Sequence, residues 1–245
     1  MNALLLAFTT LLFTQFNALA CTKTLVMSTN ETNWQPYLIK QGDTFLGTEV
    51  DAVNTIFKDS AFCVKWIYFP SLLRVQEELK YGRVDITFAA SYTEKRAQYA
   101  HFSSPYREEI MLLYKHKDSP DVTSLPAIFN YNHTTAVNRG SFFGDEFEQL
   151  REPFFKQIIL TAQANNRFGM LDKKRVDYII DDSVVAAHLA KKYNSILKVN
   201  SIAPININNV HFMLSKKSVS PAEVTAINQL IYKNKEAIKL IYQNN

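Results

Sequence analysis

The sequence predicts an α/β protein made of two successive units in which strands and helices alternate. Two observations support this prediction. Short apolar runs that suit buried strands are separated by segments whose apolar residues recur at helical spacing. The same alternation then begins again in the second half of the chain. We therefore expect two lobes, each a mostly parallel sheet with helices on both faces.

The first unit has a β–α–β–α–β order. Ser71 is a good N-cap for its second helix, and Gly82 is a good residue at which to end that helix. The expected strands cover residues 24–28, 64–69 and 84–89, and the expected helices cover residues 48–61 and 72–82. Residues 29–47, between the first strand and the first helix, are expected to form a loop.

The second unit repeats this order and ends in closing helices. Gly140 and Ser141 are expected to open one helix, Thr161 the next, and Asp182 a third. Ser220 starts the closing helices, because Pro at N1 and Glu three residues after the cap complete a capping box. The expected strands cover residues 110–115, 134–137, 158–160, 176–180 and 210–214.

The first twenty residues are mostly apolar, carry no charged side chain and end in Ala-Leu-Ala. This pattern predicts a signal peptide cleaved before Cys21, although the usual Lys or Arg near the start is missing. Cys21 and Cys63 each precede an apolar run, so neighbouring parallel strands would place them at one sheet edge, where they form a disulfide. The alternatives are two buried free thiols, and acylation of Cys21, which excludes that disulfide. No later segment has the roughly 18 apolar residues of a membrane span.

The charged residues give no sign of a nucleic-acid partner. The net charge is +4, and the Lys and Arg residues are scattered along the chain. The five His residues lack metal-ligand spacing, and we expect neither a metal nor a cofactor.

Residues 85–107 are the most informative segment. A buried strand ends near Ser91, Thr93 is a good N-cap, and Arg96 lies in the first turn of the helix that follows. Hydroxyls, free backbone N–H groups and a guanidinium at a strand end suit a small carboxylate, because a guanidinium donates two parallel hydrogen bonds to it.

This segment resembles extracellular solute-binding protein family 3, the solute-binding proteins of ABC importers for polar amino acids. The shared strings are G-x-x-D at residues 82–85, T-x-x-R at 93–96 and F-S-x-P-Y at 102–106. The resemblance, which runs from about Lys23 to Tyr242, implies the type II periplasmic binding protein fold, with two lobes joined by two hinge crossings near residues 106–109 and 204–209. The implied division is a signal peptide at 1–20, lobe one at 21–107 and 209–245, and lobe two at 108–208.

The resemblance also implies ligand contacts in the cleft. Arg96 would bind an α-carboxylate with help from Ser91, and Asp182 would bind an ammonium group. Asp182 is alternatively only a helix N-cap, and Asp181 is the substitute if the register differs by one. Ser141 and Phe142 match a loop of lobe two whose backbone faces the carboxylate, although relatives often have Ser or Thr in place of Phe142. Ser141 is alternatively only a helix cap.

Three further residues are candidates through the same resemblance. Trp34 matches an aromatic that stacks on the ligand, but its usual partner aromatic is replaced by Leu72. Arg74 matches an Arg in a subset of relatives that faces the cleft. Glu31 lies where some relatives place an acid for cationic side chains.

The expected function is periplasmic capture of a small amino-acid-like solute by closure of two lobes, as a monomer that delivers the solute to a membrane permease. Two alternatives stay open: an enzyme on the same scaffold, similar to cyclohexadienyl dehydratase, with Glu31 or Asp182 as acid or base, and a partner of a membrane sensor. The sequence shows no Ser-His pair or additional carboxylate pattern that favours an enzyme.

Overall fold

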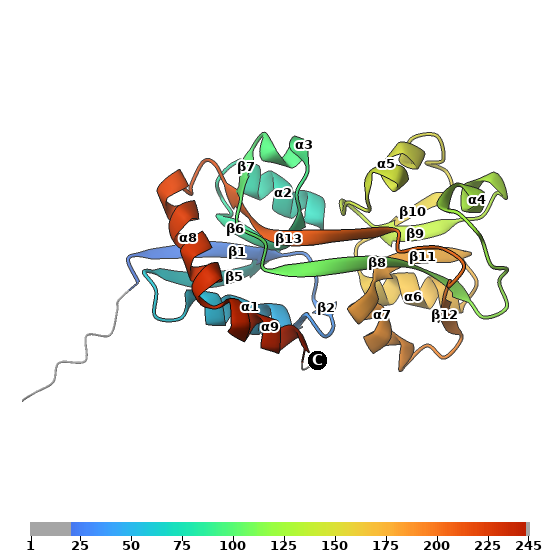
Figure 1. Ribbon diagram of the computed structural model, residues 1–245, viewed down its shortest axis with the longest axis horizontal. Coiled ribbons are helices and arrows are strands. Elements are labelled where there is room, and N and C mark those ends of the chain that lie inside the picture. The colour runs from blue at the N-terminus through green and yellow to red at the C-terminus, as the bar shows by residue number, and fades with distance from the viewer. Residues whose placement is uncertain (1–20, 244–245) are drawn as a thin grey trace, which may run out of the picture.

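The computed structural model describes residues 21–243, so the expected signal peptide lies outside the described residues. Two lobes lie side by side and are joined by two long strands, β8 and β13 (Figure 1). These are β8 (Arg107–His116) and β13 (Asn206–Ser215). Both strands are longer than expected, because each continues through the hinge instead of ending at it.

One ten-stranded sheet runs through both lobes, in the order β10-β9-β11-β8-β13-β6-β1-β5, with β12 paired to β8 and β7 paired to β13. Within each lobe the outer strands are parallel, whereas β8 and β13 pair antiparallel with each other and with their neighbours. Each strand of this antiparallel pair crosses from one lobe to the other, so the hinge is a hydrogen-bonded ribbon of two strands.

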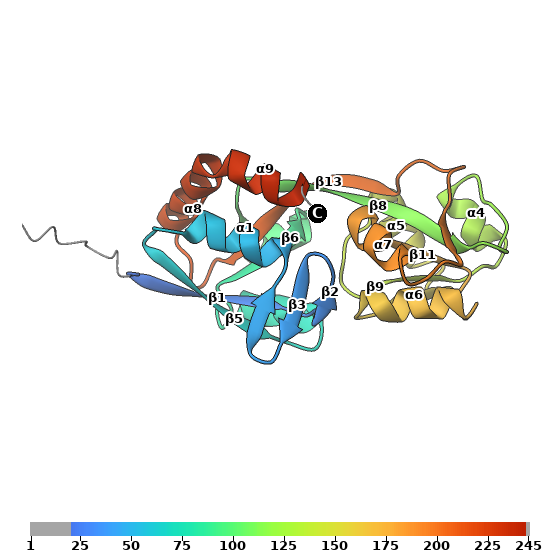
Figure 2. The ribbon, with the colours of Figure 1, turned by 90° about the horizontal axis from the view of Figure 1, so that it is seen from below.

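The elements of lobe one follow the predicted order. Its strands are β1 (Lys23–Thr29), β5 (Phe62–Tyr68), β6 (Ile86–Ser91) and β7 (Ala100–Phe102). Its helices are α1 (Thr48–Phe57), α2 (Leu72–Lys80), α3 (Glu94–Ala97), α8 (Pro221–Lys233) and α9 (Lys235–Gln243). Apolar residues of α1, α8 and α9 pack on one face of the sheet, and α2 covers the other. Figure 2 shows α1, α8 and α9 together on one side of lobe one.

The loop expected at residues 29–47 contains a small antiparallel sheet. Its strands are β2 (Asn33–Trp34), β3 (Leu38–Gln41) and β4 (Thr44–Leu46). Strands of two to four residues show too little alternation to be recognised in a sequence. This sheet holds Trp34 and Tyr37 at the edge of lobe one that faces lobe two.

Lobe two has helices on both faces of its sheet, as predicted. Its further strands are β9 (Thr135–Asn138), β10 (Ile158–Thr161), β11 (Tyr178–Asp182) and β12 (Ile196–Lys198). Its helices are α4 (Leu125–Asn130), α5 (Asp145–Arg151), α6 (Ala164–Asp172) and α7 (Ser183–Ala190). The first two helices pack on one face and the last two on the other (Figure 1).

Two expected helix starts are wrong. The helix expected at Gly140 begins at Asp145, because Gly140 and Gly144 adopt positive φ of 86° and 91°, which helices do not contain. The helix expected at Thr161 begins at Ala164, because Thr161 is the last residue of β10.

Cys21 and Cys63 form a disulfide, with a Cα–Cα distance of 5.5 Å. This confirms the predicted pairing. Strands β1 and β5 are adjacent and parallel, and Cys63 lies opposite Thr24 in their register. The bond therefore ties the start of the described chain to the edge strand of lobe one.

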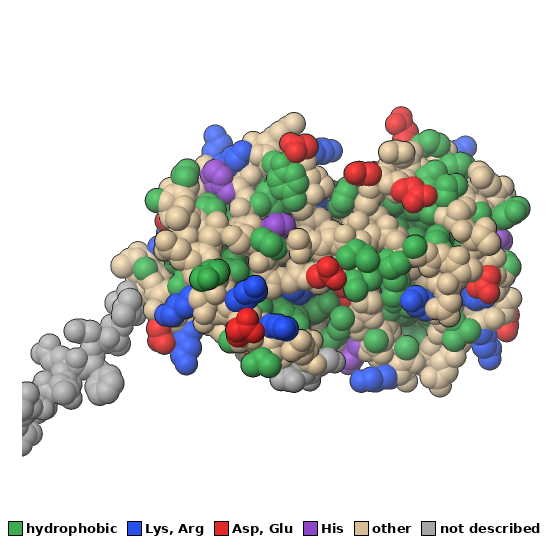
Figure 3. Space-filling view, in the orientation of Figure 1, with side chains coloured by type: hydrophobic (Ala, Val, Ile, Leu, Met, Phe, Trp, Pro, Cys, Tyr) green, Lys and Arg blue, Asp and Glu red, His purple; other side chains and the backbone are tan. Residues whose placement is uncertain are grey.

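The surface in Figure 3 shows acidic and basic side chains mixed over the visible face, with no large area of one sign. This agrees with the scattered charges of the sequence. Within residues 21–243 no helix is both long enough and apolar enough to span a membrane.

Candidate ligand-binding cleft

A cavity of about 80 Å³ lies between the lobes, where strands of both lobes end. Lobe one contributes residues after β1 and at the end of β6, and lobe two contributes residues at the ends of β9 and β11. Ligands of open α/β sheets bind beyond the carboxyl ends of strands. Seven of the eight predicted ligand-binding residues line this cavity: Glu31, Trp34, Ser91, Arg96, Ser141, Phe142 and Asp182.

Arg74 lies outside the cavity. Leu72 lines it, but Arg74 follows two residues later on α2 and so points about 200° further round the helix. Its guanidinium forms an ion pair with Glu78 at 2.5 Å, and 57% of its side chain is exposed.

Arg96 joins the two lobes in the cavity wall. Thr93 caps its short helix by accepting a hydrogen bond from the Arg96 backbone N–H, which fixes the start of the side chain. The guanidinium donates from Nη1 to the Ser91 carbonyl at 2.7 Å and from Nη2 to the Gly140 carbonyl of lobe two at 2.9 Å. Burial lowers the pKa of Arg96, yet an arginine stays charged in proteins. Within residues 21–243 its other guanidinium N–H groups make no hydrogen bond, so they suit a carboxylate.

Polar side chains of both lobes line the same cavity as Arg96. Ser91 is buried, and its hydroxyl accepts a hydrogen bond from Nδ2 of Asn208 at 3.1 Å. In lobe two, Nδ2 of Asn138 donates to the Ser141 hydroxyl at 2.9 Å. That bond holds residues 140–143 as a loop against the cavity, so Ser141 is not the N-cap of a helix.

Asp182 is both a helix cap and a cavity residue. Its Oδ1 accepts hydrogen bonds from the backbone N–H groups of Val184 and Val185 at 2.8 and 3.1 Å, and from the Tyr37 hydroxyl of lobe one at 3.1 Å. Its Oδ2 is buried and has no partner among the described residues. Burial raises the pKa of this carboxyl, because the desolvated charge is only partly offset by Arg107. The free oxygen is suited to an ammonium group.

Asp181, the substitute for Asp182, is occupied by protein contacts. Its Oδ2 accepts a hydrogen bond from Nε of Arg167 at 2.8 Å, and both side chains are almost fully buried. Its Oδ1 accepts a bond from the backbone N–H of Asp182. Arg167 also donates to the Thr161 hydroxyl. This ion pair forms part of the cavity floor.

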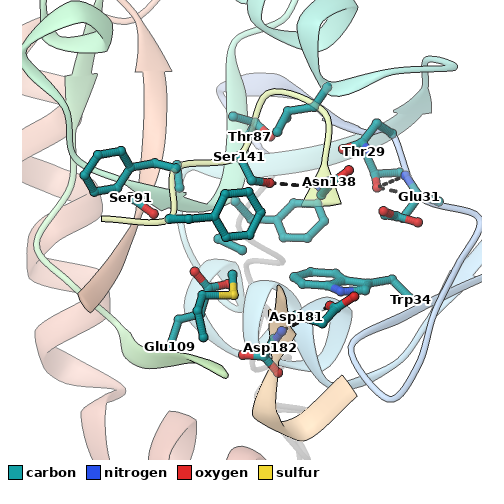
Figure 4. A pocket seen from close by; sticks show the side chains of 18 of the residues that line it. Thr29, Glu31, Trp34, Thr87, Ser91, Glu109, Asn138, Ser141, Asp181 and Asp182 are labelled. Carbon is teal, nitrogen blue, oxygen red and sulfur yellow. Dashed lines mark hydrogen bonds between the residues drawn. The ribbon is translucent and has the colours of Figure 1, made fainter. Parts of the chain in front are cut away.

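Glu31 and Trp34 lie on the lobe-one side of the cavity (Figure 4). Trp34 packs against Tyr37 and Phe88, with ring centroids 4.6 and 6.4 Å apart. Glu31 is 5% exposed, and its Oε2 has no partner within the described chain. Burial raises the pKa of Glu31 to about 8, against the opposing effect of Arg167. The carboxyl therefore holds a proton at neutral pH.

Sequence reasoning missed several cavity residues: Thr29, Asn30, Gln76, Glu109, Met111, Asn138 and Arg167. Gln76 could have been found, since it lies one helical turn after Leu72 on the same face of α2. Glu109 gave no such signal, because its place in the cavity depends on the pairing of β8 with β13.

The chain belongs to the bacterial extracellular solute-binding proteins, family 3, whose model matches residues 25–240. Proteins of this family are extracellular or periplasmic. A search of curated proteins found no match.

Solved structures with the same two-lobed fold share little sequence with the chain. A histidine kinase sensor domain with similarity to periplasmic binding proteins is 18% identical, with a TM-score of 0.77 over 90% of this chain and 95% of that one. An ancestral arginine-binding protein bound to arginine is 19% identical, with a TM-score of 0.76 over 90% and 97%. The ancestral amino acid-binding protein AncCDT-1, a precursor of cyclohexadienyl dehydratase, is 20% identical, with a TM-score of 0.73 over 90% and 94%. These likenesses establish the type II periplasmic binding protein fold.

Proposed function

We propose that the protein captures a small amino-acid-like solute outside the cytoplasmic membrane by closing its two lobes over it. The observation that carries this proposal is the pair of opposite charges in the cavity. Arg96 of lobe one uses two of its five guanidinium N–H groups for carbonyls of the described residues, and Asp182 of lobe two has a buried carboxylate oxygen with no partner among those residues. A guanidinium suits the α-carboxylate and a buried carboxylate suits the ammonium group of an amino acid.

Contacts between the lobes support the closure step. Arg96 donates to Gly140, Tyr37 donates to Asp182, and Nε2 of Gln163 donates to the Asn30 carbonyl at 3.0 Å. These bonds link lobe one to lobe two around the cavity, so they exist only when the cleft is shut. A ligand that contacts both lobes binds the closed state better and shifts the population toward it.

A thermal-shift screen of the amino acids, followed by small-angle scattering, tests this function. A ligand at 100 times its dissociation constant stabilises the protein by about 2.7 kcal/mol, and the scattering should give a smaller radius of gyration with that ligand than without it. A screen in which no amino acid stabilises the protein would contradict the proposed ligand class. An unchanged radius at saturation would contradict closure.

Delivery to the permease of an ABC importer completes the proposal, with residues 1–20 as the signal peptide that directs the protein to the periplasm. The alternative is a partner that reports ligand binding to a membrane sensor, which the likeness to a sensor domain makes worth testing. Uptake of the labelled ligand by cells with and without the protein separates the two. Loss of uptake supports transport, and unchanged uptake supports the sensor.

An enzyme remains the second candidate function. Glu31 faces the cavity as a carboxylic acid that keeps its proton at neutral pH, and a general acid needs that property. Incubation of the protein with arogenate or prephenate tests the dehydratase reaction, with Glu31→Gln as the control. Product formation that Glu31→Gln abolishes would establish the enzyme. Absence of turnover would remove this candidate.

A further inference from the structure

Glu109 faces the cavity from the hinge strand β8. In the antiparallel register Glu109 lies opposite Asn208 of β13, and Met111, two residues on, lies opposite Asp182 of β11. Side chains two residues apart on a strand share one face, and so do residues paired across strands. Glu109 is therefore on the same side of the sheet as Asp182 and is its diagonal neighbour. Figure 4 shows both carboxyl groups at the cavity.

Among residues 21–243, Arg107 is the cation that acts most strongly on the Glu109 carboxyl, and it lowers the pKa of that group without bonding to it. Arg107 lies on the same face of β8, but its Nε donates to Oε1 of Glu49 at 2.6 Å and its Nη1 to the Glu108 carbonyl at 3.2 Å. Arg107 and Glu49 are both buried, so they form a nearly neutral pair. Within residues 21–243 no hydrogen bond or ion pair involves the Glu109 side chain, which is only 5% exposed.

The cavity has more acids than bases to balance them. Its described lining contains four carboxyl groups, from Glu31, Glu109, Asp181 and Asp182, and two guanidinium groups, from Arg96 and Arg167. Arg167 is already bound to Asp181. A zwitterionic amino acid would use Arg96 and Asp182 and would leave Glu109 without a partner. A buried ionised carboxylate without a partner is costly.

We propose that Glu109 binds a second positively charged group of the ligand, so that the protein selects amino-acid-like solutes with a net positive charge. We further propose that Glu109 releases its proton to solvent as this ligand binds. This inference rests on the proposed function, because it adds a contact to the same cavity.

The charges around Glu109 favour such an exchange. The pKa of Glu109 is raised to about 8, mainly by burial; Arg107 lowers this pKa, whereas Asp182, Glu49 and Asp181 raise it. In the closed protein without ligand, this carboxyl therefore holds a proton at pH 7. A cation at hydrogen-bond distance favours the ionised form, so the proton leaves when the cation arrives. The positive charge of the ligand then offsets the cost of keeping the ionised Glu109 carboxyl buried.

Calorimetry with a matched pair of ligands tests this inference. L-arginine and L-glutamine both carry the α-carboxylate and α-ammonium groups, but only L-arginine has a charged side chain. Titrations at pH 7 in two buffers of different ionisation enthalpy give the number of protons released. Glu109→Gln removes the ionisable group and keeps its shape, and Glu31→Gln is the comparison variant. Melting curves verify that each variant folds.

We expect L-arginine to bind more tightly than L-glutamine. Glu109→Gln should weaken L-arginine binding roughly ten- to a hundredfold, leave L-glutamine binding within about twofold, and lower the number of protons released with L-arginine by about one. In wild type, affinity for L-arginine should rise between pH 6 and 7.5, and this rise should be smaller in Glu109→Gln.

The failures of the two proposals are distinguishable. L-glutamine binding as tightly as L-arginine would overturn the inference and leave the proposed function standing. Unchanged proton release in Glu109→Gln would also overturn it, and a loss of release in Glu31→Gln alone would assign the exchange to Glu31. Failure to bind either ligand would overturn the inference, and failure of the whole amino-acid screen would overturn the proposed function as well.

Discussion

Arg96→Ala tests the central contact of the proposed cavity. The substitution removes the guanidinium that we expect to bind the ligand carboxylate. It also removes the bonds from Nη1 to the Ser91 carbonyl and from Nη2 to the Gly140 carbonyl. The Thr93 cap of the helix remains, because it accepts a bond from the backbone N–H of residue 96. Ala is a good helix former, so the local fold should persist.

Two contributions to binding are lost together. A hydrogen bond to a charged group contributes about 1.5–3 kcal/mol, so loss of the carboxylate contact weakens binding roughly ten- to a hundredfold. The bond to Gly140 joins the lobes, and its loss disfavours the closed state that the ligand requires. We therefore expect a total loss of affinity of about 100- to 1000-fold. Arg96→Lys should recover only part of it, because an ammonium group cannot donate two parallel bonds.

Calorimetry with the amino acid that gives the largest thermal shift measures this loss, and a melting curve for each variant verifies folding. Arg74→Ala is the matched control, because this arginine lies outside the cavity and its side chain is 57% exposed. Affinity should be unchanged in Arg74→Ala. A folded Arg96→Ala protein that binds as tightly as wild type would refute the assignment. A loss in Arg74→Ala alone would make Arg74 the carboxylate contact.

Three other perturbations have expected outcomes. Replacing Cys21 and Cys63 by Ser should lower the free energy of unfolding by about 2–4 kcal/mol in urea titrations, because the bond joins residues 42 apart; unchanged stability would contradict this. Tyr37→Phe removes the bond between the lobes to Asp182, so scattering of the protein with ligand should show a larger radius of gyration than wild type with ligand, and an unchanged radius would count against that bond as a closure contact. Burial raises the pKa of Glu31 from 4.5 to about 8. Between these pH values the folded protein therefore binds one proton more at Glu31 than the unfolded chain does. Stability should fall as pH rises from 5 to 8, with Glu31 contributing up to about 1.4 kcal/mol per pH unit, and Glu31→Gln should reduce this dependence in urea titrations at pH 5, 6.5 and 8, leaving the part due to Glu109.

Local signals predicted most of the fold. The N-caps Ser71, Thr93 and Ser220 accept hydrogen bonds as their sequence contexts indicate, and Ser220 and Glu223 complete the capping box. The errors arose at residues whose secondary structure depends on pairing with residues distant in the sequence. Strands β8 and β13 extend past their apolar runs because each pairs with the other across the hinge. Polar residues such as Asn208 can occupy this ribbon because pairing satisfies their backbone groups.

Cavity residues were predicted where a sequence motif fixes the local backbone. They were missed where their position depends on the pairing register of the strands. Arg96 and Ser91 follow from their local string, and the structure places both at the cavity. The outward direction of Arg74 could have been derived from helical spacing after Leu72. The inward direction of Glu109 could not, because residues next to it in sequence do not indicate which face of β8 meets the cavity.

The hinge and the cavity share residues, and this has a consequence for how binding and closure are coupled. Glu109 and Asn208 are paired across the two crossing strands, and Nδ2 of Asn208 donates to the hydroxyl of Ser91, which lines the cavity. A rotation of one lobe must twist this ribbon, so it moves Glu109 relative to Ser91. A ligand held between them therefore resists that twist directly. Substitutions of Asn208 should therefore change ligand affinity and lobe closure together. A hinge made of loops would allow these two properties to vary independently.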